Sequence, residues 1–319
     1  MIHYRPFLNS DPPAIAEIWR SQPPTNSFIQ LMTPAVLDDL VYSKPFFDRA
    51  GLILAVQDDK PVGFVHAGFG PNAELTGIDH NSGTTALLLV SPHRDRETIA
   101  RELLSRSEQY LLGQGATTLF GGATKLLAPF YLGLYGGSQL SGILASDVNS
   151  TALYREAGYS ESVHARVFRC DLRGFRAPVD RELMQVRRQF QLVKQAESLP
   201  RTWWEACEFA AIERLEFVLL PKAKGAPVAE ATFWDIEPLA SSWGVHAMGL
   251  ASIEIDASPN ACAVATHFIG EIFRQLQGFG ITLVEFQLRP NESLAVEACR
   301  KLGFEEINTG LLFRKPSSS

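Results

Sequence analysis

A segment in the first half of the sequence could hold an anion at the start of a helix. Residues 90–100 (VSPHRDRETIA) end an apolar run and then place Arg94 and Arg96 beside a predicted helix start. Thr98 and Ala100 are small residues of the first helical turn. A helix N-terminus presents unpaired N–H groups and the positive end of the helix dipole, so small side chains there allow a phosphate to approach the backbone. The same residues are equally consistent with an ordinary charged helix start.

The second half of the sequence has a corresponding segment with fewer charges. Residues 255–265 (IDASPNACAVA) place Ala263 and Ala265 at the small positions and the neutral Asn260 at the helix start. An anion could be held there by backbone N–H groups alone. In the competing interpretation, Asn260 or Ser258 is simply the cap of the helix.

Each half also contains a helix that ends in glycine followed by an aromatic residue. The two segments are 152–159 (ALYREAGY) and 297–304 (EACRKLGF). Tyr154 and Cys299 occupy the same place in them, before the glycine. Tyr154 is therefore either a functional hydroxyl or a buried aromatic ring whose hydroxyl is only a polar handle.

The hydrophobic pattern predicts the elements that position these segments. Apolar stripes at helical spacing indicate helices, whereas short apolar or alternating runs between turn residues indicate strands. In the first half we expect strands at 2–7, 52–57, 62–67, 85–90, 117–120 and 165–170, and helices from about 12, from about 33, at 96–112 and near 149–158. In the second half we expect helices at 203–214, 261–277 and 293–302, and strands at 217–220, 228–234, 249–256, 282–288 and 311–314.

The two halves repeat one order of elements, which indicates a duplication. Gly115 and Gly158 are 43 positions apart, whereas Gly280 and Gly303 are 23 positions apart, so the first half carries about 20 extra residues. We place this insertion within residues 121–142. Its apolar side chains, which could flank a ligand or simply pack, are Phe130, Tyr131, Leu132, Leu134 and Tyr135.

A short polar segment with Gly and Pro, residues 171–178 (DLRGFRAP), is the best candidate for a linker. It divides the chain into a first domain, residues 1–172, and a second domain, residues 179–319. A length of 319 residues is typical of two domains.

The helix endings at 152–159 and 297–304 resemble the A-x-x-L-Y-x-x-x-G-F helix of the GNAT N-acetyltransferases, an acyl-coenzyme-A-dependent superfamily. In both halves this helix follows the strand–loop–helix that holds the coenzyme A pyrophosphate in that family, so the resemblance covers nearly the whole chain. It implies an α/β (mixed α+β) fold of two tandem GNAT-like domains, each with a mixed, splayed central sheet flanked by helices. It also implies acetyl-CoA as the acyl donor, and an amine of a small molecule or a protein as the acceptor.

The resemblance also implies roles for residues of this sequence. The expected cofactor-binding residues are Leu89, Val90, Arg94, Arg96, Thr98, Ala100, Ile255, Ala263 and Ala265. Tyr154 would protonate the leaving thiolate, and Cys299 at the equivalent place puts catalysis by the second half in doubt. The candidates for the general base, each of which could equally be an ordinary surface residue, are Glu74, Asp79, His80 and Glu254. A non-catalytic acyl-CoA-binding or regulatory protein, and a purely structural pair of domains, fit the same residues.

Composition narrows the class of partner. The formal net charge is −6 and no long basic run occurs, so we expect no nucleic-acid partner. No apolar run approaches the length of about 18 residues that a membrane helix needs. The four cysteines are widely spaced and the histidines are scattered, so we expect no metal site and a cytoplasmic location with free thiols. The acceptor and the oligomeric state are not specified by any motif.

Overall fold

The structure is a computed structural model, and it describes residues 1–23, 32–124, 127, 130–131, 142–195, 199–209, 212–236, 244–289 and 291–316. Its strands are β1 (Ile2–Pro6), β2 (Leu52–Gln57), β3 (Lys60–Pro71), β4 (Ile78–Val90), β5 (Thr118–Gly121), β6 (Ile143–Leu144), β7 (Ser160–Asp171), β8 (Phe190–Lys194), β9 (Arg214–Pro221), β10 (Ala229–Asp235), β11 (Ala247–Ile255), β12 (Leu283–Leu288) and β13 (Glu305–Pro316). Its helices are α1 (Pro12–Arg20), α2 (Pro34–Leu37), α3 (Arg96–Gly113), α4 (Val148–Glu156), α5 (Arg181–Gln189), α6 (Trp203–Glu208), α8 (Ala261–Gly278) and α9 (Ser293–Lys301), with a π-helical turn at Asp38–Tyr42 and a 3₁₀ turn at Arg49–Gly51.

Helices cover both faces of the sheet in the first half of the chain. Helix α1 begins at consecutive prolines, which helices tolerate in their first turn, and it buries Ile15, Ile18 and Trp19 against one face together with α2. Helix α3 packs on the opposite face through a stripe that includes Ile99 and Leu103. In the second half, α8 and α9 share one apolar core with the sheet, and α5 packs against α8.

Both halves have the splayed mixed sheet that the resemblance implies. Strands β4 and β5 pair in parallel only over Ser82–Thr85, and the register of β4 with β3 shifts immediately afterwards, at Ala86. Strands β11 and β12 pair in parallel only over Ala247–Gly249, and the register of β11 shifts at Ala251. Beyond these points the parallel partners separate, so the prediction of a splayed sheet is confirmed.

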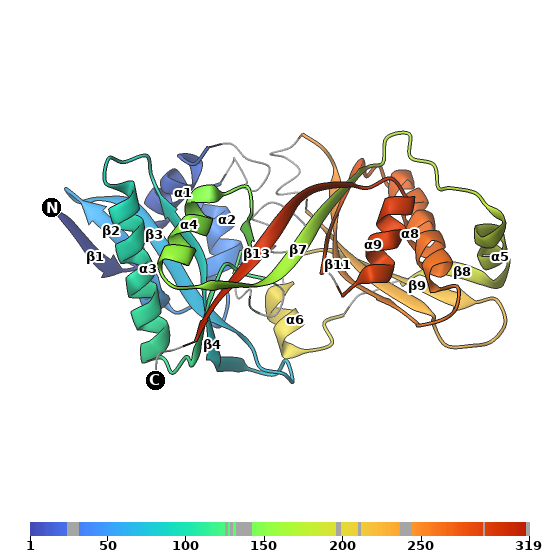
Figure 1. The fold of residues 1–319 in the computed structure, drawn as a ribbon, viewed down its shortest axis with the longest axis horizontal. Helices are drawn as coiled ribbons and strands as arrows, with labels where there is room; N and C mark the ends of the chain where they lie inside the picture. Colours follow the sequence, from blue (N-terminus) through green and yellow to red (C-terminus); the bar gives the residue numbers. More distant parts are fainter. Residues whose placement is uncertain are drawn as a thin grey trace.

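The two sheets are joined into one, because the halves exchange strands. Strand β13 of the second half pairs with β5 and β7, and β7 of the first half pairs with β13 and β12. Figure 1 shows β7 and β13 running side by side across the middle of the molecule, and both chain ends lying in the same half. Cross-strand ion pairs, between Arg166 and Glu306 and between Arg169 and the buried Glu285, hold this region together.

The positions of equivalent elements locate the insertion. Helices α3 and α8 start 165 positions apart, as do β5 and β12, whereas α4 and α9 start 145 positions apart, as do β7 and β13. The extra residues therefore lie between β5 and α4, as the glycine spacing predicts. Of the aromatic and apolar residues expected there, Phe130 and Tyr131 are buried, while Leu132, Leu134 and Tyr135 lie outside the described residues.

Three elements of the second half differ from the expectation. Helix α6 ends at Glu208 rather than 214, because Arg214 already pairs with Trp234 as the first residue of β9. Helix α5 and strand β8 were not expected. Helix α5 is mostly polar. The Asp180 side chain accepts from the Leu183 N–H at 2.8 Å and caps the helix, which buries Leu183 and Val186.

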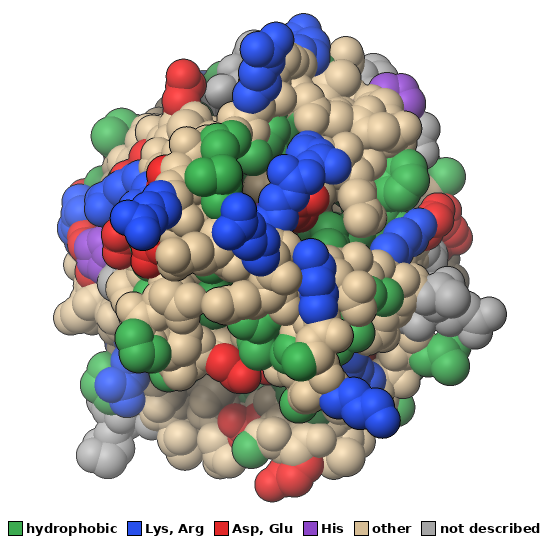
Figure 2. Space-filling model, turned by 90° about the vertical axis from the view of Figure 1, so that its right-hand side faces the viewer, with side chains coloured by type: hydrophobic (Ala, Val, Ile, Leu, Met, Phe, Trp, Pro, Cys, Tyr) green, Lys and Arg blue, Asp and Glu red, His purple; other side chains and the backbone are tan. Residues whose placement is uncertain are grey.

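Two kinds of feature are relevant among the described residues: helices that could span a membrane and clusters of metal-binding side chains. None of the helices there combines the length and apolar character needed to cross a bilayer, and no cluster of His, Cys, Asp and Glu with ligand geometry occurs among them. All four cysteines are free thiols. Figure 2 shows Lys and Arg side chains across the middle of the end formed by the second half, and Asp and Glu side chains around a hollow at its lower edge.

One histidine of the first half is fully buried and contacts several aromatic side chains. His66 of β3 has no exposed surface, its ring stacks on Phe130 at 4.1 Å between centroids, and its Nδ1 lies 2.8 Å from the Tyr131 hydroxyl. Its Nε2 has no hydrogen-bond partner among the described residues. Burial lowers the pKa of His66 from 6.5 to about 3, since a charged imidazolium is costly in this apolar environment.

This pKa shift predicts an acid-sensitive stability. Between 6.5 and about 3 the unfolded chain binds a proton at residue 66 that the folded protein does not, so stability is lost as the pH falls through this window, by about 1.4 kcal/mol per pH unit. Urea unfolding of His66→Phe should therefore give a free energy that depends less steeply on pH between about pH 6 and pH 4. His3→Phe, at an exposed residue, is the control and should keep the wild-type slope. Parallel curves for His66→Phe and wild type would show that the imidazole titrates normally.

The strand exchange predicts that a mutation in β13 weakens the first half. Phe313 is fully buried and stacks on Tyr154 of α4 at 5.5 Å between centroids. Phe313→Ala should cost about 3–5 kcal/mol and should reduce amide hydrogen-exchange protection in β5 and α4. Ile307→Ala, on the same strand but 38% exposed, is the control and should cost less than about 1 kcal/mol. Loss of protection confined to the second half would contradict the exchange.

Candidate functional site

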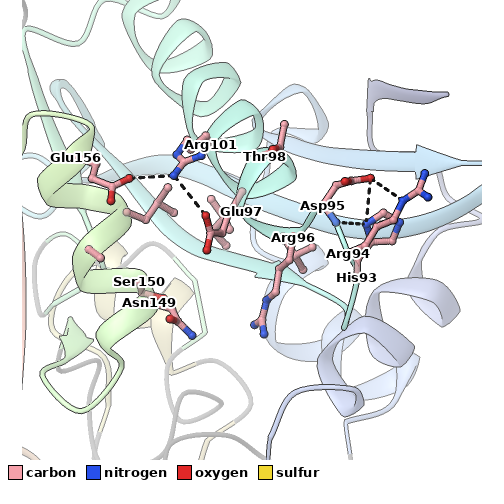
Figure 3. Close-up of a pocket in the computed structure, with 15 residues that line it drawn as sticks. His93, Arg94, Asp95, Arg96, Glu97, Thr98, Arg101, Asn149, Ser150 and Glu156 are labelled. Atoms are coloured by element: carbon pink, nitrogen blue, oxygen red, sulfur yellow. Dashed lines mark hydrogen bonds and ion pairs between the residues drawn. The ribbon is translucent and has the colours of Figure 1, made fainter.

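A cavity of about 560 Å³ opens at the N-terminus of α3, between α3, α4 and the end of β4. Figure 3 shows the residues that line it. They come from β4 and the loop after it, from the first turns of α3 and from one face of α4: Leu88, Val90, His93, Arg94, Asp95, Arg96, Glu97, Thr98, Ala100, Arg101, Asn149, Ser150, Ala152, Leu153 and Glu156.

The start of α3 is not closed by a capping side chain. Asp95 stands at the N-cap position but accepts no hydrogen bond from the first turn, because its backbone conformation is not the extended one that a capping residue usually adopts. The Asp95 N–H donates instead to Nδ1 of His93 at 3.0 Å. A helix start of this kind offers first-turn N–H groups and the positive end of the dipole to an anion in the cavity.

Most charges around the cavity compensate one another. Arg101 lies 3.5 Å from Glu97 and 3.2 Å from Glu156, so it links α3 to α4 across one side of the cavity. Arg94 lies 3.2 Å from Asp95. These side chains are largely exposed, so the ion pairs contribute little to stability. Their effect is to neutralise the acidic groups that would otherwise repel an anion.

Arg96 is the cation of this cavity that has no acidic partner among the described residues. Its Nη2 donates to Oε1 of Gln22 at 3.1 Å. Gln22 is held in turn by its amide, which donates to the carbonyl oxygens of Ile18 at 2.8 Å and Val90 at 3.2 Å. Figure 3 shows the Arg96 side chain extending away from the ion pairs of Arg101. A neutral partner positions the guanidinium and leaves its charge available to an anion.

The structure gathers five of the predicted cofactor residues at this one cavity: Val90, Arg94, Arg96, Thr98 and Ala100. Leu89, also predicted, points the other way. Its side chain packs in the core beneath α1 and α2, as alternation along a strand requires when its neighbours face α3. Only the backbone of Leu89 can therefore serve a ligand on the α3 face.

Tyr154 does not line the cavity, because it lies on the face of α4 that packs on the sheet. Its ring covers Gly121, the last residue of β5 to pair with β4, so closely that a Cβ at Gly121 would lie 2.3 Å from Cε1 of the tyrosine. Gly121 is thus required by close packing. The ring of Tyr154 is consequently placed at the point where β4 and β5 separate.

The equivalent region of the second half is built differently. Ala263 and Ala265 are buried in its core and Ile255 packs at the edge of that core, so these three predicted residues line none of the cavities described here. Lys301 of α9 donates to the sulfur of Cys262 in the first turn of α8 at 3.2 Å. This hydrogen bond links α9 to the start of α8. The equivalent position in the first half, between α4 and the start of α3, is the cavity described above.

The capping alternatives and the candidate bases can also be placed. Asn260 is at the N-cap position of α8 without capping it, and Ser258 donates to the Asn260 side chain at 3.1 Å.

None of the candidate bases lines the cavity at α3. Asp79 accepts from Asn81 at 2.9 Å, and the His80 ring lies 4.6 Å from that of Phe69, so both have structural partners.

The cavity includes residues that the sequence interpretation did not single out. Asn149, Leu153 and Glu156 share one face of α4, at spacings of four and three residues that a helix brings together. This helical spacing would have allowed the three residues to be identified from the sequence. No local pattern indicates Gln22 or the link from Arg101 to Glu156, because both depend on contacts between distant segments.

No protein-family model matches the chain, and no curated protein matches its sequence. Solved structures do match its fold. A tandem GNAT protein from the clavulanic acid biosynthesis pathway aligns over 100% of this chain and 99% of its own, with a TM-score of 0.62 at 15% identity. A GCN5-related N-acetyltransferase from Sphaerobacter thermophilus aligns over 99% of this chain and 95% of its own, with a TM-score of 0.61 at 15% identity. A glucosamine N-acetyltransferase region of a fungal multidomain β-N-acetylglucosaminidase gives a TM-score of 0.65 at 12% identity, and the match covers 99% of this chain and 38% of that one. The chain therefore has the fold of a tandem GNAT protein.

Proposed function

We propose that the chain is an acyl-CoA-dependent N-acyltransferase that transfers an acetyl group from acetyl-CoA to an amine. The observation that carries the proposal is the open start of α3, where an uncapped helix N-terminus meets a guanidinium without an acidic partner among the described residues, within a tandem GNAT fold. A pyrophosphate needs this combination of N–H donors and positive charge.

The residues present fit such a cofactor. Arg96 and the first-turn N–H groups would bind the pyrophosphate, with Arg94 at the rim and Thr98 and Ala100 small enough to permit close approach. The backbone of Leu89 and Val90 would bind the arm that leads from the pyrophosphate toward the split in the sheet. Binding at Ile255, Ala263 and Ala265 in the second half remains a separate prediction.

When bound, acetyl-CoA supplies an activated thioester. The nitrogen of a neutral amine would bond to the acetyl carbon, the carbon–sulfur bond would break, and the nitrogen would then lose a proton. Backbone N–H groups of β4 would stabilise the oxyanion that forms on the carbonyl oxygen. The Tyr154 hydroxyl, at the point where β4 and β5 separate, would donate its proton to the leaving thiolate and recover one from solvent or from the amine.

The charge argument predicts a specific effect of Arg96. Arg96→Gln removes a charge-assisted contact to the pyrophosphate, so the Kd for acetyl-CoA, measured by calorimetry, should rise roughly tenfold or more. Arg106→Gln is the matched control. Arg106 lies on the same helix outside the cavity, paired with Glu102 at 2.8 Å, and its variant should bind acetyl-CoA as the wild type does. Equal affinity in both variants would show that the anion binds elsewhere.

The role of Tyr154 is tested by separating turnover from affinity. Tyr154→Phe should lower the rate of coenzyme A release in the presence of an amine panel by about 10²-fold or more, because the leaving thiolate loses its proton donor. The Kd for acetyl-CoA should change less than about twofold, since the hydroxyl acts on the leaving group. Cys299→Ala, at the equivalent place in the second half, should leave turnover nearly unchanged. If Tyr154→Phe turned over at the wild-type rate, Tyr154 would be a packing residue only. If the wild-type protein bound acetyl-CoA but turned over none of the amines, it would be a non-catalytic acyl-CoA-binding protein.

A further inference from the structure

The hydrogen bond between α8 and α9 joins a thiol to an amine that solvent can reach. Nζ of Lys301 lies 3.2 Å from Sγ of Cys262, between two helices that pack side by side in the second half (Figure 1). The structure describes all four cysteines, and Cys262 is the one that is not buried. The Lys301 side chain is 49% exposed. A sulfur nucleophile and a primary amine therefore lie together where a small reagent can approach them.

Three side chains determine the protonation of this pair. Burial is the main factor that raises the pKa of Cys262, while Lys301 lowers this pKa and Glu297 raises it. The hydrogen bond to Cys262 is the main factor that raises the pKa of Lys301, and Glu297 adds to the increase. At neutral pH the pair is therefore mainly a thiol beside an ammonium group, and each becomes a nucleophile as the pH rises.

The start of α8 favours negative charge at Cys262. This cysteine is the second residue of the helix, and the Asn260 side chain does not cap the first turn. Unpaired N–H groups and the positive end of the helix dipole stabilise a thiolate, and they also stabilise the oxyanion that forms when a thiolate attacks a thioester. The surroundings of Cys262 thus assist attack on a carbonyl carbon once the thiol has lost its proton.

We propose that Cys262 and Lys301 form a self-acylation site, in which the cysteine takes an acetyl group from a thioester and passes it to the lysine. Acetyl-CoA is such a thioester, and the inference does not depend on its binding at α3. The Cys262 thiolate bonds to the acetyl carbon, the bond from that carbon to the donor sulfur breaks, and the donor leaves as a thiolate. The neutral Lys301 amine then bonds to the same carbon, the bond to Sγ breaks, and the nitrogen loses a proton to solvent.

The contact makes the second step a reaction within one molecule. Reacting groups about 3–3.5 Å apart are placed for attack, so no further collision is needed. A thioester sulfur accepts hydrogen bonds weakly, so acetylation of Cys262 removes the main factor that raises the pKa of Lys301, and the ammonium loses its proton more readily. The product is a neutral amide, which ends the ion pair of Lys301 with Glu297 at 3.4 Å.

The test follows acetylation of the full chain by peptide mass spectrometry at mildly alkaline pH. Acetyl-CoA should label Lys301 at least about tenfold faster than Lys60, an exposed lysine of the first half. Cys262→Ala should slow the labelling of Lys301 to the rate of Lys60. S-acetyl-N-acetylcysteamine, a thioester without a nucleotide, should label the wild type at the same residue. Dilution of the protein at constant thioester concentration should not change the labelled fraction, because the transfer occurs within one chain.

A second variant separates the two steps. Lys301→Arg keeps a positive charge beside the sulfur but provides no neutral amine, so an acetyl thioester should accumulate on Cys262. Hydroxylamine should remove this label, whereas the amide on Lys301 of the wild type should resist it. Lys60→Arg is the matched control and should leave the labelling of Lys301 unchanged. Because Lys301 is exposed, this variant keeps the proposal testable if Cys262→Ala folds poorly.

Three results would each overturn the proposal: labelling of Lys301 no faster than that of Lys60 in the wild type, unchanged labelling of Lys301 in Cys262→Ala, or no thioester on Cys262 in Lys301→Arg. Failure of the proposed function looks different. In that case Lys301 would still be labelled, but calorimetry would detect no acetyl-CoA binding and no added amine would be acetylated. Conversely, acetyl-CoA binding and turnover without preferential labelling of Lys301 would retain the acyltransferase and reject the self-acylation site.

Discussion

The antiparallel pairing of β7 with β13 is the contact on which the rest of the molecule depends. Each of these strands follows the Gly-aromatic end of a helix in its own half and then completes the sheet of the other half. The pairing extends over most of both strands and is reinforced by the ion pair of Arg166 with Glu306, while Arg169 pairs with Glu285 of β12 on the other side of β7. It also brings Phe313 against Tyr154, so a side chain of the second half fixes the ring at the split in the first.

The duplicated architecture has diverged at equivalent places. In the first half, Arg101 pairs with Glu97 and Glu156, and the start of α3 faces a cavity. In the second half, Lys301 of α9 donates a hydrogen bond to the sulfur of Cys262 in the first turn of α8. Burial is the main factor that raises the pKa of the Cys262 thiol above its usual value, so this cysteine is predominantly a neutral hydrogen-bond partner of Lys301. The start of α3 is thus open to a cavity, whereas the start of α8 is linked to α9.

The sequence allowed prediction of those features that are encoded within one element. The stripes of α3 and α8 follow from local periodicity, and the place of the insertion follows from glycine spacing. The splayed sheet was expected only from the resemblance to the GNAT family. The exchange could not be predicted in this way, because the short apolar run of β13, Leu311 to Phe313, does not specify which sheet the strand joins. Helix α5 was missed because only Leu183 and Val186 of it are buried. In the site, the residues at the start of α3 were accessible to prediction, whereas Gln22, which positions Arg96, lies 74 positions away from it in the sequence.

The exchange has a consequence for how the protein is made. Ribosomes add about 5–20 residues per second, so on the order of 10 to 40 s separates the synthesis of β5 from that of β13. During that interval the edge of β5 lacks the partner that covers it in the finished molecule, and unpaired edges are the places where nascent chains associate wrongly. The first half is therefore synthesised early but completed late, and a chain whose translation stops before residue 305 lacks the strand that completes the sheet of the first half. Assembly of the site is in this way coupled to completion of translation through β13.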